Sequence, residues 1–102
     1  MGPATLPLAM EYLMANKAAV INMSLSAERE YEGIGNALRK SSNTLVVAAA
    51  GNTRVGDRTG VDLGLERVYP ARYGGFGGDF KDKVITVAAH DVNGKLACFS
   101  NY

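Results

Sequence analysis

The sequence of 102 residues corresponds to one domain or to part of one, and its 47% hydrophobic and 21% charged residues exclude a disordered tail. The net charge of +1 gives no reason to expect nucleic acid or an anionic membrane surface as a partner. The longest apolar runs are too short to span a bilayer, so we expect no membrane segment.

The chain opens with a predicted helix followed by a strand. Thr5 is a candidate helix cap, and Pro7 fits the first helical turn, where its missing N–H is harmless. Residues 8–17 are apolar on most sides, so this helix needs cover on more than one face. The apolar residues 18–25 then predict a buried strand.

Residues 26–50 predict a second helix and a second buried strand. Ser26 is a candidate cap, and acidic residues early and basic residues late in the helix favour its dipole. Three apolar residues at helical spacing should face the sheet: Tyr31, Ile34 and Leu38. Residues 44–50 form the next strand, so the two strands should be parallel with a right-handed crossover.

The second half of the chain is less regular. Residues 51–82 hold eight of the twelve glycines and show no sustained period, which predicts a long irregular loop that is functional or mobile. Its glycine run 74–78 is expected to be a flexible tip and not a phosphate loop. Residues 83–89 predict a third strand, and the turn at Asn93-Gly94 leads into a short return strand over 96–100.

Three parallel strands with at most one crossover helix on each face make an incomplete sheet. Parallel sheets need cover on both faces, and their edges are not left bare. We therefore predict an α/β fold with a partial parallel sheet and crossover helices. Such a chain is a piece of a larger domain, or it completes itself by self-association.

The sequence contains no complete catalytic constellation. His90 is the only histidine, and its neighbour Asp91 would point to the opposite face of a strand and so could not orient it. The only cysteine, Cys98, alternates with Leu96 and is expected in the core and not as a nucleophile. No zinc cluster or calcium-loop spacing is present, so no metal is expected in this chain.

One strand end carries more information than its neighbours. Residues 46–52 run from a buried strand into Gly51-Asn52 at the carboxyl edge of the sheet, where open α/β folds bind ligands. An amide held there by rigid backbone can donate a hydrogen bond to an oxygen that becomes negative during a reaction. On these residues alone, the alternative of an ordinary strand followed by a Gly-Asn turn stays open.

Five segments, in this order, resemble the middle of the catalytic domain of the subtilisin-like serine proteases, or subtilases. They are VINMSLS (20–26), VVAAAGN (46–52), YPARY (69–73), VITVAAHD (84–91) and FSN (99–101). The resemblance covers roughly residues 8–102. It implies that residues 1–102 are part of a three-layer α/β/α peptidase domain, with 51–82 as a glycine-rich loop inside it.

The resemblance also implies a substrate site. Asn52 takes the place of the side-chain donor of the family's oxyanion hole, and Val68 that of the residue at the floor of the primary specificity pocket. Ser26 replaces a glycine usual in the family, so its side chain could crowd the substrate strand. The peptide bond between Tyr69 and Pro70 resembles one that is cis in the family. One wall of the pocket, which also pairs with the substrate backbone, would be Ser24, Leu25 and Ser26, and the opposite wall Ala49, Ala50 and Gly51.

The catalytic motifs of the family, Asp-Ser/Thr-Gly, His-Gly-Thr and Gly-Thr-Ser-Met-Ala, are absent from this sequence. Family order places the Asp and His before residue 1 and the Ser after residue 102. The resemblance thus implies a segment of a secreted or cell-surface serine endopeptidase, without a signal peptide of its own and inactive in isolation. Two alternatives remain: a non-catalytic subtilase descendant that binds peptides or assembles, and an unrelated flavodoxin-like domain.

The implied partners are a peptide or protein substrate and the remainder of the protease domain, or further copies of this fragment. No cofactor is implied for this chain. An insertion over residues 74–83 disrupts a loop that binds a cation in some members, while calcium in the parent protein is left open.

Overall fold

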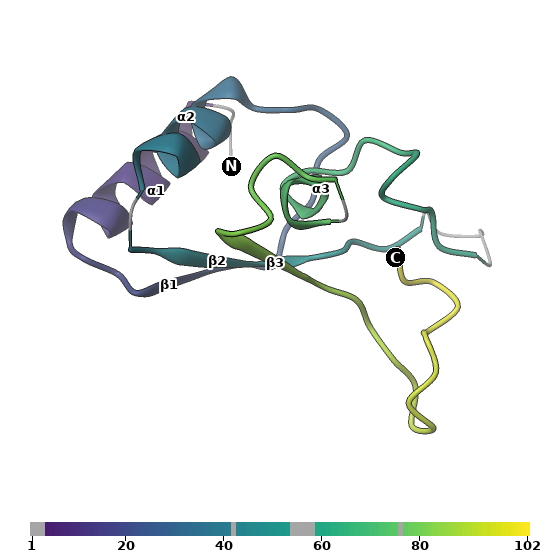
Figure 1. Ribbon diagram of the computed structural model, residues 1–102. Coiled ribbons are helices and arrows are strands. Elements are labelled where there is room, and N and C mark those ends of the chain that lie inside the picture. The colour runs from purple at the N-terminus through teal and green to yellow at the C-terminus, as the bar shows by residue number, and fades with distance from the viewer. Residues whose placement is uncertain (1–3, 42, 54–58, 76) are drawn as a thin grey trace.

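The computed structural model, which describes residues 4–41, 43–53, 59–75 and 77–102, has a parallel sheet at its centre. Strands β1 (Val20–Met23), β2 (Leu45–Ala49) and β3 (Val84–Val87) lie side by side in this order (Figure 1). Both neighbouring pairs are parallel, with Val20 opposite Leu45 and Val46 opposite Val84. The predicted parallel arrangement is confirmed, and all three carboxyl ends meet at one edge.

The helices cover one face of this sheet. Helices α1 (Thr5–Ala15), α2 (Glu32–Lys40) and α3 (Ala71–Gly74) all lie on the same side in Figure 1. Side chains that alternate along the strands pack into one core with them, namely Ile21, Met23, Val46, Ala48 and Val84. On the other face the side chains of Val20, Ile85 and Val87 are 57%, 50% and 50% exposed, so this face is open.

The first helix begins earlier than predicted, and Thr5 is its first residue and not its cap. Ala4 takes the N-cap position, and no side chain caps the helix. Leu6 and Met10 are buried, whereas Leu8 and Tyr12 are 64% and 67% exposed. The predicted cover on more than one face is therefore not found among the described residues.

The second helix begins at Glu32, and the prediction of a cap at Ser26 is wrong. The segment before the helix is not helical: Ala27 pairs with Tyr69 in an isolated antiparallel bridge, and residues 28–29 form a bend. This long-range pairing overrides the local helix signals. Within α2 the predicted inward side chains Ile34 and Leu38 are buried, and Tyr31 packs, partly buried, against the same core.

The glycine-rich stretch folds back onto the sheet. A Cβ added at Gly74, the last residue of α3, would lie 2.5 Å from the carbonyl oxygen of Val84, so this end of the glycine run packs against β3, while the predicted flexibility of the tip stays a prediction. Phe76, in the same run, lies outside the described residues, as do residues 54–58 of the predicted loop.

The chain beyond β3 forms single bridges instead of the predicted return strand over 96–100. His90 pairs with Leu96, and Ser100 pairs with Asn52, with no strand between them. Cys98 is exposed, so its expected core position is wrong, because the segment turns the neighbouring Ala97 and Ser100 inward instead. The His90 ring contacts the Asp91 backbone oxygen at 2.7 Å and not its carboxylate.

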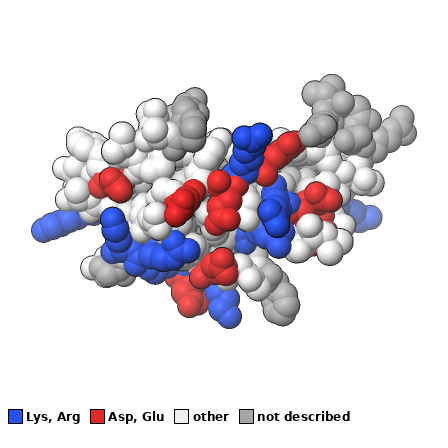
Figure 2. Space-filling view, turned by 90° about the horizontal axis from the view of Figure 1, so that it is seen from above, with Lys and Arg blue, Asp and Glu red and all other residues white. Residues whose placement is uncertain are grey.

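Figure 2 looks onto the face that carries the helices. Acidic and basic side chains alternate across its middle, without a large area of one sign. Within the described ranges, no helix is long and apolar enough to cross a membrane.

Lys83 fastens the start of β3 to the end of α2. Its Nζ donates hydrogen bonds to the carbonyl oxygens of Leu38 (2.7 Å) and Ser41 (2.6 Å). A cation is also favoured there because the carboxyl end of a helix carries partial negative charge. This contact joins the strand–helix unit of the first half to the third strand.

We expect Lys83→Met to lower the free energy of unfolding of the intact protein by about 1.5–3 kcal/mol, the scale of hydrogen bonds from a charged group. Urea titration followed by circular dichroism measures the loss. Lys81→Met is the matched control, because Lys81 is exposed in the neighbouring turn. Equal unfolding midpoints for the two variants would show that the Lys83 contacts do not stabilise the fold.

Candidate functional site

The segments that carry the predicted site residues converge at the carboxyl edge of the sheet. Ser26 comes from the segment after β1, Gly51 from the end of β2, and Val68 from the loop before α3. A Cβ added at Gly51 would lie 3.0 Å from Asn101 Nδ2, 3.3 Å from Val68 Cγ1 and 3.5 Å from Ser26 Cβ. Gly51 is therefore the point where four segments, distant in sequence, touch.

Gly51 needs to be glycine for two independent reasons. Its φ of +86° lies in the left-handed region, which side chains other than glycine rarely adopt. The side chains of Asn101 and Val68 would also have to give way by a few tenths of an ångström to any Cβ. The backbone turns sharply here and presents the next residue, Asn52, at the edge of the sheet.

The Asn52 side chain is exposed on a backbone that is fixed on both sides. The Gly51 carbonyl oxygen accepts a hydrogen bond from Asn101 N at 3.0 Å, and Thr53 N donates to the Phe99 carbonyl oxygen at 2.8 Å. Within the part of the chain that the structure describes, the Asn52 amide itself makes no hydrogen bond. Its donors are thus free for a ligand while its Cα position is held.

Asn101 is the residue that sequence reasoning missed. It is 2% exposed, and its Nδ2 donates to the Ala50 carbonyl oxygen at 3.0 Å. Its Oδ1 accepts from Val61 N at 3.1 Å, so a single side chain joins the end of β2 to the loop around Val61. The FSN segment contributed to the family resemblance, but it did not predict that Asn101 connects these two parts of the chain.

The segment of Ser24, Leu25 and Ser26 continues beyond β1 and lies outside the strand ladder. Ser24 and Ser26 are exposed and Leu25 is partly buried, and the Ser24 hydroxyl exchanges hydrogen bonds with the Asn22 side chain. Next in the chain, Ala27 exchanges both backbone hydrogen bonds with Tyr69, at 2.9 and 2.8 Å. The predicted cis bond between Tyr69 and Pro70 is confirmed.

A hollow of about 1090 Å³ opens beside this edge. Of the predicted site residues, the structure places Ser26, Asn52 and Val68 in its lining, with charged side chains at Glu28, Glu66 and Arg67. The other predicted residues do not line it, and Ala50 is buried against Leu63 and Ala71. These remaining residues are Ser24, Leu25, Ala49, Ala50 and Gly51.

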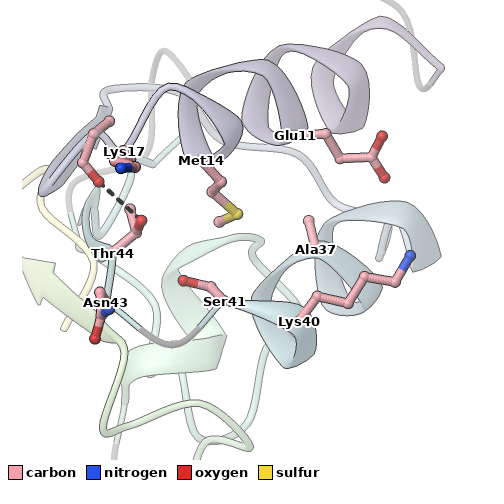
Figure 3. Close-up of a pocket in the computed structure, with 9 residues that line it drawn as sticks. Glu11, Met14, Lys17, Ala37, Lys40, Ser41, Asn43 and Thr44 are labelled. Carbon is pink, nitrogen blue, oxygen red and sulfur yellow. Dashed lines mark hydrogen bonds between the residues drawn. The ribbon is translucent and has the colours of Figure 1, made fainter.

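A second hollow, of about 720 Å³, lies at the opposite edge of the sheet, between the C-terminal ends of α1 and α2 (Figure 3). The Ser41 hydroxyl in its lining is buried and has no hydrogen-bond partner among the described residues. Lys17 and Lys40 stand there together with Glu11, beside helix ends that themselves attract cations. Charges of both signs therefore meet in its lining, as they do in the first hollow.

Comparison with known proteins agrees with this geometry. The model of the subtilase family matches residues 4–102. A thermostable alkaline protease from Halalkalibacterium halodurans is 37% identical over 101 residues, which cover 97% of this chain and 23% of that protein. The crystal structure of MycP1 with its N-terminal propeptide removed matches with a TM-score of 0.72 at 24% identity, covering 97% of this chain and 36% of that chain.

The chain therefore spans a minor part of both relatives. The structural match shows that the three parallel strands and their helices are a fragment of an α/β subtilisin-like fold. Since the family model covers almost every residue, the chain belongs to the subtilase family.

Proposed function

We propose that this chain is the central segment of a subtilisin-like serine endopeptidase, to which it contributes an oxyanion-hole donor and the strand that holds the substrate. The observation that carries the proposal is the exposed Asn52 amide, which has no hydrogen-bond partner among the described residues, on a backbone held by Asn101 and Phe99. The enzyme would hydrolyse a peptide bond through an acyl-enzyme, with the nucleophile and base contributed by the remainder of the domain.

In this proposal Asn52 acts on the tetrahedral intermediate. When a serine attacks the scissile carbonyl, the carbonyl oxygen becomes negative and shifts its position. An amide donor placed to meet the oxygen in its new position stabilises the negative charge. The donor must be held in advance, because reorganising it during the reaction would cost part of the gain. The two backbone hydrogen bonds on either side of Asn52 supply that rigidity.

The substrate backbone would lie along Ser24, Leu25 and Ser26 as an added strand, because this segment is unpaired in the sheet. The side chain before the scissile bond would enter the hollow, with Val68 at its floor. For Ala49, Ala50 and Gly51 we propose backbone support behind the opposite wall, because none of the three lines the hollow and Ala50 turns its side chain into the core. Ser26 would narrow the entrance, as its Cβ lies close to Gly51.

The proposal extends to the partners and location of the parent protein. The open sheet face with Val20, Ile85 and Val87 supports packing against the remainder of the protease domain, or against a second copy when the chain is isolated. The likeness to a bacterial alkaline protease supports secretion or display at the cell surface. We assign no metal to this chain, and calcium in the parent protein stays a prediction.

The intact protein is expected to hydrolyse a fluorogenic peptide and to be labelled by a serine-directed fluorophosphonate. The isolated 102-residue chain is expected to do neither, because the motifs of the catalytic Asp, His and Ser are absent from its sequence. Peptide hydrolysis by the isolated chain, abolished by the phosphonate, would contradict this. An intact protein that binds peptides but is never labelled would instead identify a non-catalytic peptide-binding descendant.

A further inference from the structure

Two segments that flank the hollow are tied to each other twice. The first tie is the backbone bridge between Ala27 and Tyr69. The second is a side-chain hydrogen bond, in which the Tyr73 hydroxyl donates to Glu30 Oε1 at 2.9 Å. Both ties run between the segment that continues Ser26 and the turn that follows Val68.

The Tyr73 ring is tightly packed, so its hydroxyl group is held in a defined position. It is 2% exposed and lies edge-on to the rings of Tyr69 and Phe80, with centroid distances of 5.0 and 5.1 Å. A Cβ added at Gly35 of α2 would lie 3.6 Å from the Tyr73 hydroxyl oxygen, so the hydroxyl lies next to this helix. Burial, and then the Glu30 carboxylate, raise the pKa of Tyr73, so the hydroxyl stays a donor.

We infer that Tyr73 and Glu30 are positioning residues that set the width of the hollow lined by Ser26, Asn52 and Val68. This inference rests on the proposed function. Ser26 on one wall and Val68 at the floor belong to the two segments that this pair ties together. Without the second tie, the segment after Ser26 can pivot about the single bridge at Ala27. Asn52 is held separately, by Phe99 and Asn101, so the chemistry should be affected less than side-chain selection.

The test uses the intact protease and peptides that differ only in the side chain before the scissile bond, as alanine, leucine or phenylalanine. Tyr73→Phe removes the hydroxyl and keeps the ring. We expect it to narrow the ratio of kcat/KM between the best and worst peptide by about three- to tenfold, the scale of one hydrogen bond. The change should lie in KM, with kcat on the best peptide kept.

Matched variants separate this role from general destabilisation. Glu30→Gln keeps an acceptor for the hydroxyl and should retain the wild-type ratio, whereas Glu30→Ala should reproduce Tyr73→Phe. Tyr12→Phe makes the same change at a 67% exposed tyrosine and should have no effect. An unchanged ratio in Tyr73→Phe, or a parallel fall of kcat on all three peptides, would overturn the inference.

Binding of the same peptides, followed by fluorescence anisotropy with uncleavable scissile bonds, measures selection without catalysis. If the wild-type protein binds the three peptides with different affinities but hydrolyses none, the proposed function is wrong. The effect of Tyr73→Phe on those affinities then still tests the inference. If hydrolysis is normal and Tyr73→Phe selects like the wild type, the inference alone fails.

Discussion

We expect Asn52→Ala in the intact protease to lower kcat by about 10²–10³-fold with KM nearly unchanged, a scale that comes from removal of one oxyanion-hole donor in the related enzyme subtilisin and not from this structure. The reason is that the amide would donate its hydrogen bond to the substrate carbonyl oxygen at full strength only when that oxygen carries negative charge. An interaction made only in the transition state affects kcat and leaves ground-state binding alone.

The Asn52 variant is a clean test because the fold does not depend on this side chain. Its amide makes no hydrogen bond within the described ranges, and the residue is exposed. Unfolding by urea should therefore be unchanged. Asn93→Ala, in an exposed turn, is the matched control for the chemical change. A kcat equal to that of the wild type would remove Asn52 from the mechanism.

The parallel strands could be predicted because their signal is local. Apolar runs of strand length, separated by a helix, leave few other arrangements, and the observed ladder of β1, β2 and β3 follows them. The start of α2 could not be predicted in the same way. The residues after Ser26 carry good helix-start signals, yet Ala27 is taken by Tyr69, which lies far along the chain.

The prediction of a return strand over residues 96–100 is wrong for a related reason. Leu96 and Cys98 alternate as strand residues do, but a strand needs a continuous partner, and this segment meets only single residues of the chain. Cys98 is consequently exposed. The prediction of at most one crossover helix on each face is wrong, because α2 and α3 lie on the same face as α1 and leave the other face open.

In the candidate site, too, features contained in a local motif could be predicted, and features that depend on long-range contacts could not. Asn52 and the turn at Tyr69 and Pro70 could be placed from motifs, because each motif contains the residue that matters. The Asn101 bridge could not, since its partners Ala50 and Val61 are distant in sequence. A polar residue in the FSN segment is a weak signal until the three-dimensional contacts are known.

Asn101→Ala should be the most destabilising of the substitutions at this edge. It leaves the buried Ala50 carbonyl and the part-buried Val61 N–H without their partner. Each buried group left unpaired costs about 1–3 kcal/mol, so we expect a loss of about 2–5 kcal/mol in the free energy of unfolding. Urea titration of the intact protein measures it, with Asn93→Ala again as the control.

The same variant should also lower kcat, although Asn101 lines the hollow and is given no contact with the reacting atoms in the proposed complex. Its Nδ2 lies 3.0 Å from where a Cβ at Gly51 would be, so it packs against the turn that aims Asn52. Asn101→Asp sharpens the test, because the new carboxyl can accept from Val61 but can donate to Ala50 only when protonated. Burial favours the protonated form, so this variant should be less destabilised at acidic than at neutral pH. Wild-type stability in both variants would show that the Asn101 bridge does not hold the site together.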